Sequence, residues 1–241
     1  LPKFEAVPDI VSAGLDTVGV RFPSHPVAKR IIELCKFPLA APSANLSGRP
    51  SPTTAHHVMH DLEGRISFIV DGGSSDFGLE STVLDTTSSP PMILRPGAIT
   101  ASMLRPYIPG IQVYGQSSRN MVLEDRPPTP GMKYKHYAPS ASVVSFKPGS
   151  ELEERVQRFL SEHKGKKFVR LCIQYRPEYN NVENHYLSRK ADLLEVARNL
   201  FSGLREADLR LPDYILAEEV NEDDEGLAIM NRLGKASSLR L

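Results

Sequence analysis

Apolar positions in the first hundred residues recur with two different periods. Residues 17–22 alternate and are rich in β-branched side chains, which predicts a strand. Residues 26–36 begin on a proline and place Val27, Ile31 and Leu34 on one face, which predicts a helix. The same reasoning predicts a helix at residues 53–62, strands at 67–71, 81–85 and 91–95, and a short helix from Thr100 toward Tyr107.

Residues 109–141 show neither period and contain several prolines, so we interpret them as a long linker. Beyond the linker, strand and helix patterns alternate, which predicts a small, open α/β sheet of Rossmann-like type. We expect strands at 143–146, 168–173 and 214–217, and helices at 151–162, 191–204 and 226–236. The expected division is a first domain of residues 1–108, a linker of 109–141 and a C-terminal domain of 142–241.

Three short loops rich in serine, threonine and glycine interrupt the first part of the chain. They occupy residues 41–53, 71–83 and 93–97. The N–H groups and hydroxyls of such loops suit phosphate or carboxylate oxygens. Ser51 and Pro52 are favourable as the N-cap and first residue of a helix, whose positive end would face the loop. Arg21 and Arg95 end two expected strands and can bind an anion through paired hydrogen bonds. The sequence therefore predicts an anion-binding cleft.

Overall composition narrows the class of protein. The 241 residues carry 29 basic and 29 acidic side chains, so no global charge favours nucleic acid or a membrane. Cys35 and Cys172 are far apart, which indicates neither a zinc knuckle nor a disulfide framework. A reducing compartment is expected, the cytoplasm first, with a mitochondrial or plastid pool as the alternative. The chain shows no apolar run long enough to span a bilayer.

Other candidate chemistry is weaker. His56 and His60 lie one helical turn apart, but no third metal ligand accompanies them. Ser81 lacks the surroundings of a hydrolase nucleophile. The acidic run at residues 218–225 lacks the spacing of a calcium loop, so we interpret it as a solvated loop before the last helix. We therefore expect no metal ligands and no protein nucleophile.

The polar loops resemble a known family. They are similar to the YrdC-like domain of threonylcarbamoyl-AMP synthases, in the long form that carries a second domain. The linker end and the last helix are also similar to that family, so the resemblance covers nearly the whole chain. The matching segments are residues 14–21, 41–48, 51–53, 78–83, 94–99, 130–139 and 228–233.

The resemblance implies an enzyme that condenses L-threonine, bicarbonate or carbon dioxide, and ATP into threonylcarbamoyl-AMP, releasing pyrophosphate. Mg²⁺ is expected with the ATP, and a partner complex then moves the threonylcarbamoyl group to adenosine in tRNA. Such a transfer depends on positioning and charge neutralisation. By resemblance, the ATP contacts are Thr17, Ser43, Asn45, Ser51, Arg95 and Tyr137, and the threonine contacts are Arg21, Ala41 and Ser81.

By the same resemblance, the match starts inside the first domain, and a Lys-x-Arg segment of the ATP site would lie upstream of Leu1. The chain alone is then expected to be nearly inactive. We expect the linker to act as a lid that closes through Tyr137. Two alternatives stay open at this point: a non-catalytic RNA-binding module of YrdC-like fold with weak RNA contact, and a carbamoyl transferase of the hydrogenase-maturation type.

Overall fold

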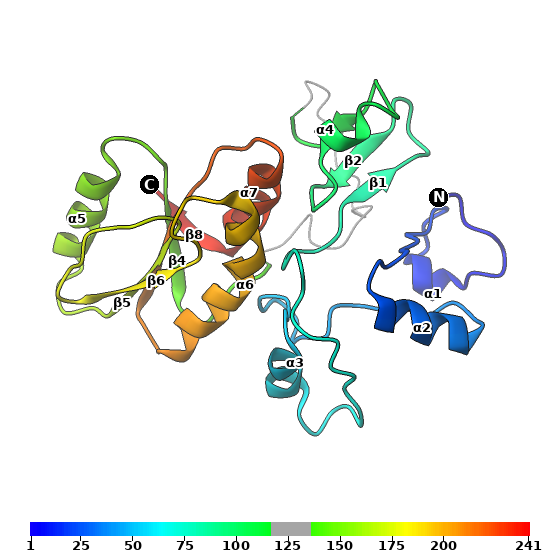
Figure 1. Cartoon of the computed structure of the whole chain (residues 1–241), viewed down its shortest axis with the longest axis horizontal. Coiled ribbons are helices and arrows are strands. Elements are labelled where there is room, and N and C mark those ends of the chain that lie inside the picture. The colour runs from blue at the N-terminus through cyan, green and yellow to red at the C-terminus, as the bar shows by residue number, and fades with distance from the viewer. Residues whose placement is uncertain (117–135) are drawn as a thin grey trace.

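The computed structural model describes residues 1–116 and 136–241 (Figure 1). A five-stranded, wholly parallel sheet in the order β6-β5-β7-β4-β8 organises its C-terminal part, which confirms the predicted α/β domain. The elements are β4 (Ser142–Phe146), α5 (Leu152–Glu162), β5 (Phe168–Cys172), β6 (Val182–Tyr186), α6 (Leu193–Leu209), β7 (Tyr214–Glu218), α7 (Glu225–Ala236) and β8 (Ser237–Arg240).

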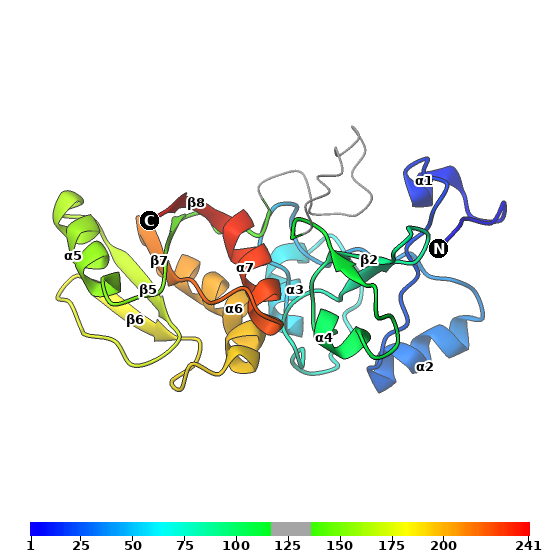
Figure 2. The ribbon, with the colours of Figure 1, turned by 90° about the horizontal axis from the view of Figure 1, so that it is seen from above.

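Helices cover both faces of this sheet. Successive side chains of a strand point to opposite faces, so Val143 and Val144 enter different cores. Helix α5 covers the core that contains Val144, and α6 and α7 cover the core that contains Val143. Figure 2 shows α6 and α7 on the side of the sheet toward the first part of the chain, with α5 at the far end. The two helices α6 and α7 therefore carry the contacts between the parts.

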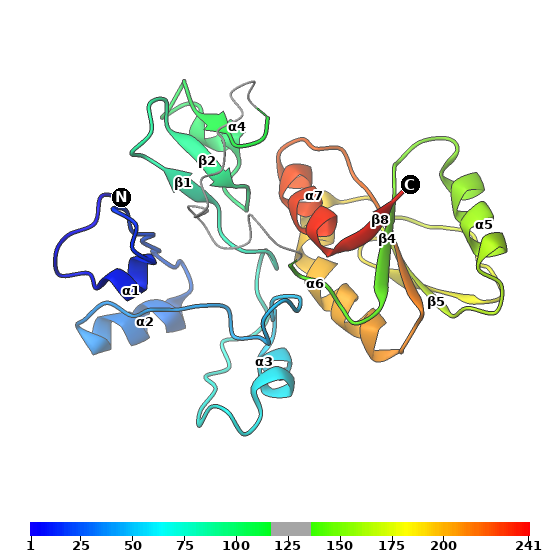
Figure 3. The same cartoon turned by 180° about the vertical axis from the view of Figure 1, so that it is seen from behind.

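The first part of the chain contains a small three-stranded sheet. The predicted hairpin is confirmed, because β1 and β2 pair antiparallel, and β3 adds to β2 in parallel. Ile93, Ile111 and Val113 form its core. Helices α1 and α2 lie at the end of the molecule away from the C-terminal sheet (Figure 3). The elements are α1 (Asp9–Ser12), α2 (Pro26–Cys35), α3 (Ala55–Leu62), β1 (Val83–Asp85), β2 (Met92–Arg95), α4 (Ala101–Leu104) and β3 (Gln112–Val113).

Two of the predicted strands, at residues 17–22 and 67–71, are wrong. Thr17 forms only an isolated bridge with Pro2, and neither segment is a regular strand. Phe22 and Phe68 are 88% and 90% exposed. A strand is stable only when neighbouring strands pair its N–H and C=O groups. The apolar pattern of these segments alone cannot supply such a partner.

Helix starts were predicted with mixed success. Helix α2 begins on Pro26 as expected, and Thr100 caps α4 by accepting a hydrogen bond from the Met103 N–H at 3.3 Å. Ser51, however, is not the cap of α3. Thr54 caps it instead, accepting from the His57 N–H at 3.3 Å. The Ser51 hydroxyl is turned away because it bonds a carboxylate of another loop.

The sequence pattern also missed both edge strands of the parallel sheet, β6 and β8. Their sequences, Val-Glu-Asn-His-Tyr and Ser-Ser-Leu-Arg, are largely polar and at most half-buried. Edge strands lack the continuous apolar run of central parallel strands, so their composition resembles that of loops. Within residues 1–116 and 136–241, no helix is long and apolar enough to cross a membrane.

Candidate functional site

A buried ion pair joins the C-terminal domain to the polar loops of the first part. Arg232 of α7 is fully buried and donates from Nε to Glu80 Oε2 at 2.9 Å. Its other nitrogens donate to the backbone carbonyls of Glu80 and Pro96. On the opposite side of the carboxylate, the Ser51 hydroxyl donates to Glu80 Oε1 at 2.6 Å. Glu80 and Arg232 thus tie together all three loops predicted to bind an anion.

An ion pair fixes α3 against α6, and hydrogen bonds fix the end of the linker to the same helix. Arg205 of α6 donates to both carboxylate oxygens of Asp61, at 3.0 and 2.6 Å. Burial raises the pKa of Asp61, but the hydrogen bond and charge of Arg205 outweigh this effect and lower the pKa to about 2. Asp208 of α6 accepts from the Ser140 and Ala141 N–H groups, each at 2.9 Å. The C-terminal domain is therefore docked at several points.

A cavity of about 240 Å³ lies where the first polar loop meets the end of the linker. Tyr137 forms part of its wall, with φ of 65° and a ring that packs 5.1 Å from the ring of Phe201. The Ala138 N–H donates to the Gly48 carbonyl at 2.9 Å, which holds the linker end against the loop. The lining residues are Pro42, Ser43, Asn45, Ser47, Gly48, Arg49, Ser51, His136 and Tyr137.

Four of the predicted ATP contacts line this cavity: Ser43, Asn45, Ser51 and Tyr137. The Asn45 amide donates to the Leu46 and Arg49 carbonyls, so its orientation is fixed. Its buried Oδ1 has no hydrogen-bond partner among the described residues. A buried acceptor without a partner is costly, so this oxygen is available to a donor group of a ligand.

Arg95, a fifth predicted contact, ends β2 beside Tyr137. Its Nε and one terminal nitrogen donate to the Ser81 carbonyl at 3.2 and 3.1 Å, and the guanidinium lies next to the Tyr137 side chain. Gly97 allows this close approach of loops, because a Cβ there would lie 2.4 Å from the Thr82 nitrogen. The loop that carries Ser81 and the loop that follows Arg95 are thus packed backbone against backbone.

Burial changes the acidity of the groups around Arg95. Burial and then the nearby charge of Arg232 lower the pKa of Arg95. Burial and the charge of Glu80 raise the pKa of Tyr137, so its phenol stays neutral at pH 7. Burial alone would raise the pKa of Glu80, but Arg232 and the Ser51 hydroxyl outweigh it and lower that pKa. The junction between α7 and the polar loops of the first part therefore holds the ionised Glu80 carboxylate and the positively charged arginines in a place with little water. Electrostatic interactions are strong in such a place.

Arg95 and the remaining predicted residues are not among those that line the cavity. Thr17 is half-buried at its bridge with Pro2, and Arg21 is exposed outside any strand. Ala41 is exposed just before the cavity loop, and the side chain of Ser81 is exposed. The backbone of Ser81 therefore lies against Arg95, but Arg21 does not reach the cavity beside Tyr137.

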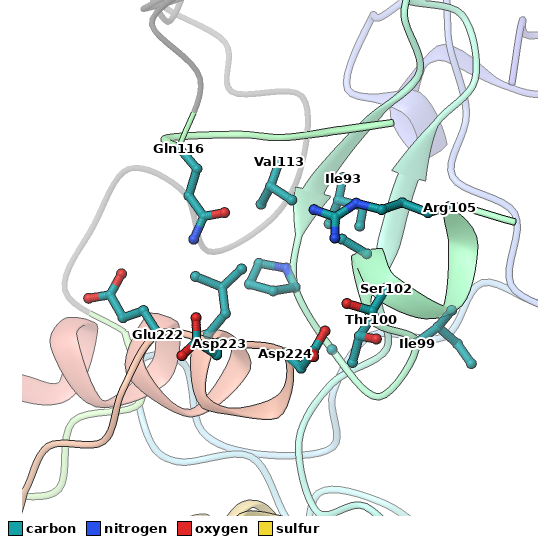
Figure 4. A pocket seen from close by; sticks show the side chains of 14 residues that line it. Ile93, Ile99, Thr100, Ser102, Arg105, Val113, Gln116, Glu222, Asp223 and Asp224 are labelled. Carbon is teal, nitrogen blue, oxygen red and sulfur yellow. The ribbon is translucent and has the colours of Figure 1, made fainter. Parts of the chain in front are cut away.

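A second cavity of about 180 Å³ lies between α4 and the start of α7 (Figure 4). Glu222, Asp223 and Asp224 face it from the α7 side, and Arg105 is a basic residue on the other side. Their net negative charge disfavours a phosphate ligand there. The acidic run was predicted to be solvated throughout, but this is wrong at its start, where Glu218 and Glu219 are buried.

Metal ligands do not gather in the part of the chain that the structure describes. No group of three or more histidine, cysteine or acidic side chains is placed to hold a metal ion there. His60 Nδ1 instead lies 3.2 Å from Asp61 Oδ1. A metal ion at the cavity would depend on oxygens of its ligand more than on protein carboxylates.

Sequence reasoning missed Glu80, Asn231, Arg232 and Lys235, which meet at the junction. Glu80 and Arg232 are 152 positions apart, and no local period relates them. The sequence did contain one signal. Glu80 and Arg232 are oppositely charged, and each lies in a segment that resembles the family, residues 78–83 and 228–233. Residues 117–135, which include most of the predicted lid, lie outside the described residues.

Comparisons with known proteins identify the family. A family model described as "Threonylcarbamoyl-AMP synthase, C-terminal domain" matches residues 99–238, and one described as "Telomere recombination" matches residues 1–97. The threonylcarbamoyl-AMP synthase of Pyrococcus abyssi is 45% identical over 248 residues, covering 100% of this chain and 70% of the relative. That of Schizosaccharomyces pombe is 42% identical, covering 97% of this chain and 60% of the relative.

A solved structure agrees with the sequence relatives. The crystal structure of P. abyssi Sua5 complexed with L-threonine matches with a TM-score of 0.87 at 44% identity, over 100% of this chain and 71% of that chain. The chain therefore belongs to the two-domain threonylcarbamoyl-AMP synthases, a family of nucleotidyl-transferring enzymes. It spans between 60% and 71% of the lengths of these relatives.

Proposed function

We propose that the protein makes threonylcarbamoyl-AMP from L-threonine, bicarbonate or carbon dioxide, and ATP, and that the cavity beside Tyr137 receives the ATP. The observation that carries this assignment is the convergence of Ser43, Asn45, Ser51 and Tyr137 on one cavity. Arg95, next to Tyr137, adds a cation beside the cavity. Hydroxyls, an unpaired amide oxygen and a guanidinium are the groups that a nucleotide needs.

The roles of these residues follow from their chemistry. Arg95 would bind phosphate oxygens, Ser43 and Ser51 would donate hydroxyl hydrogen bonds, and Asn45 Oδ1 would accept from the base or ribose. Thr17 is proposed as a further ATP contact. Arg21 would pair with the carboxylate of threonine, and Ala41 and Ser81 would contact the same threonine. Mg²⁺ would enter bound to the ATP phosphates.

The proposed chemistry needs no protein nucleophile. The threonine amine attacks the carbon of carbon dioxide and loses a proton, or attacks bicarbonate with loss of water, and in either case forms a carbamate. A carbamate oxygen then bonds to the α-phosphorus as the bond from that phosphorus to the bridging oxygen breaks, and pyrophosphate leaves. Charge builds up on phosphate oxygens during this transfer, so fixed donors such as Arg95 lower the barrier by stabilising that charge. A site closed to water protects the carbamate and the adenylate from hydrolysis.

Further proposals concern the surroundings of the enzyme. The product would be consumed by a complex that transfers the threonylcarbamoyl group to adenosine in tRNA, and the location would be the cytoplasm. The family match favours this enzyme over a non-catalytic RNA-binding module and over a carbamoyl transferase. A net charge of zero gives no support to a strong RNA contact.

Product analysis tests the proposal. The complete protein, meaning the product of the reading frame that contains these residues, is incubated with ATP, Mg²⁺, bicarbonate and L-threonine. We expect threonylcarbamoyl-AMP and pyrophosphate in equal amounts, with neither formed when threonine is left out. L-serine in place of threonine is the matched control for the side-chain methyl group. Pyrophosphate release that does not depend on an amino acid would contradict the assignment.

A further inference from the structure

The junction between α7 and the first-domain loops holds more positive than negative charge. Lys235 Nζ and a terminal nitrogen of Arg232 both donate to Asn231 Oδ1 on α7, and Arg232 and Arg95 donate to the successive carbonyls of Glu80 and Ser81, so the three cations gather around one loop. Among the described residues, the charges that act on Lys235 are those of Arg232, Arg95 and Glu80. Glu80 is already engaged, because Arg232 and the Ser51 hydroxyl bond its two oxygens. The carboxylate therefore neutralises one of three cations, and within residues 1–116 and 136–241 no further acidic group compensates Arg95 and Lys235.

The hydrogen bonds of these two cations confirm the imbalance. Lys235 Nζ donates to Asn231 Oδ1 at 2.9 Å, one helical turn earlier on α7. Arg95 donates to the Ser81 carbonyl from two of its nitrogens and lies next to the neutral Tyr137 side chain. Among the described residues, no acidic group lies within ion-pair distance of either side chain. Both cations are held in place by neutral groups, as in a site whose counter-charge is a ligand.

Holding these cations together is unfavourable in the absence of a ligand. Burial and then the charges of Arg232 and Arg95 lower the pKa of Lys235 to about 8. The pKa of Arg95 is lowered in the same way by burial and Arg232. An arrangement that opposes the charged state of its own groups is typical of functional sites.

We propose that Lys235, supplied by the C-terminal domain, binds the phosphates of ATP beside Arg95, so that both domains build the nucleotide site. This inference rests on the proposed function. A lysine ammonium acts as a compact point charge with three donors, whereas the arginine fork binds two phosphate oxygens at once. The two cations therefore complement each other on one polyanion.

Arg232 has a different part in this arrangement. Its guanidinium is fully buried and donates its hydrogen bonds to the Glu80 carboxylate and to two backbone carbonyls, so it does not reach a ligand. It is a positioning residue that fixes α7 against the loops, and thereby sets Lys235 beside Arg95. Lys235 also stands in the last turn of α7, where the helix dipole favours a cation.

Calorimetric titration of the complete protein with ATP tests the proposal. We expect Lys235→Ala to weaken ATP binding on the order of tenfold, the usual loss for one charge-assisted contact, and Lys235→Arg to bind nearly as well as the natural protein. L-threonine affinity should not change in either variant. Lys164→Ala removes an exposed lysine of the same domain and is the matched control. Unchanged ATP affinity in Lys235→Ala would overturn the inference.

A pH series adds a readout that a merely structural lysine would not move. Bound phosphates raise the pKa of a lysine that contacts them, so ATP affinity should fall as the pH rises above about 8. Lys235→Arg should lose this fall, because a guanidinium stays protonated. The other charged groups facing Lys235 are Arg95, Arg232 and Glu80, and the Lys235→Arg substitution leaves all three in place. Identical pH profiles for the natural protein and Lys235→Arg would contradict the contact.

The outcomes also separate this inference from the proposed function. If the natural protein forms threonylcarbamoyl-AMP and Lys235→Ala retains full ATP affinity, the function stands and the role of Lys235 is wrong. If the natural protein binds no ATP and forms no product, the proposed function is wrong, and the assignment of Lys235 falls with it.

Discussion

Arg232 of α7 and Glu80 of the first-domain loop form a pair across the domain boundary, with Nε and Oε2 2.9 Å apart. The Arg232 side chain is 0% exposed and that of Glu80 is 17% exposed. Little water therefore reaches the pair. The pair makes the geometry of the polar loops dependent on the C-terminal domain, which explains how a helix of one domain can shape a site in the other.

Removing one partner of this pair should destabilise the protein strongly. Arg232→Ala leaves the Glu80 carboxylate buried and unpaired, and we expect a loss of about 3–5 kcal/mol in unfolding free energy. Arg30→Ala is the control, because its 3.4 Å pair with Glu33 is exposed and should contribute less than about 1 kcal/mol. Urea denaturation of both variants measures the difference. Equal losses would show that the pair is not buried in solution.

The approach of Gly78 to α6 gives a second prediction. Gly78 has a φ of 77°, and a Cβ there would lie 2.2 Å from the Arg198 carbonyl oxygen. Gly78→Ala should therefore cost backbone strain and also force the loop away from α6. Gly73→Ala, with φ of 88° and no atom within 4 Å of its Cβ, carries the backbone strain alone. Thermal unfolding should show a larger fall in Tm for Gly78→Ala; equal falls would exclude the contact.

The two candidate arginines should separate the two substrates. Arg95→Ala should weaken ATP binding by about 1.5–3 kcal/mol, the value of a hydrogen bond to a charged group, and leave threonine binding nearly unchanged. Arg21→Ala should do the reverse. Arg65→Ala removes an exposed arginine and serves as the control. Titration with each ligand in turn checks this prediction, and a reversed pattern would reject both assignments.

The pKa of Lys235 predicts how stability depends on pH without ligand. Its folded value of about 8 lies below its ordinary value of 10.5, so the unfolded chain binds more protons between these two values. The unfolding free energy should therefore gain a contribution from Lys235 as the pH rises from about 8 to 10.5. Lys235→Met should lack this gain and be more stable than the natural protein at pH 7. Denaturation in phosphate-free buffer measures both; parallel pH curves would contradict the prediction.

Local patterns in the sequence predicted much of the C-terminal domain, because its central strands are continuous apolar runs and its helices have one apolar face. The hairpin, the start of α2 at Pro26 and the cap of α4 at Thr100 were predicted for the same local reasons. The strand predicted at residues 17–22 is not formed. A strand needs a neighbouring strand to pair with, and the local pattern of polar and apolar residues does not show whether one is present.

The candidate site was likewise predictable from the sequence only in part. The polar loop that contains Ser43, Asn45 and Ser51 was recognisable from composition and resemblance, and it does line the cavity. The N-cap expected at Ser51 was wrong because Glu80, distant in sequence, takes its hydroxyl. Arg232 and Lys235 could not be assigned from a pattern, since their meaning depends on where α7 docks. The domain bounds and the substrate contacts stay predictions.

A nucleotide site built by both domains would be visible in a structure of the complete protein with a non-hydrolysable ATP analogue. We expect the phosphates within hydrogen-bonding distance of both the Arg95 guanidinium and Lys235 Nζ, with Tyr137 against the nucleotide. Phosphates bound elsewhere, with Lys235 Nζ still bonded only to Asn231, would contradict a nucleotide site shared by the two domains.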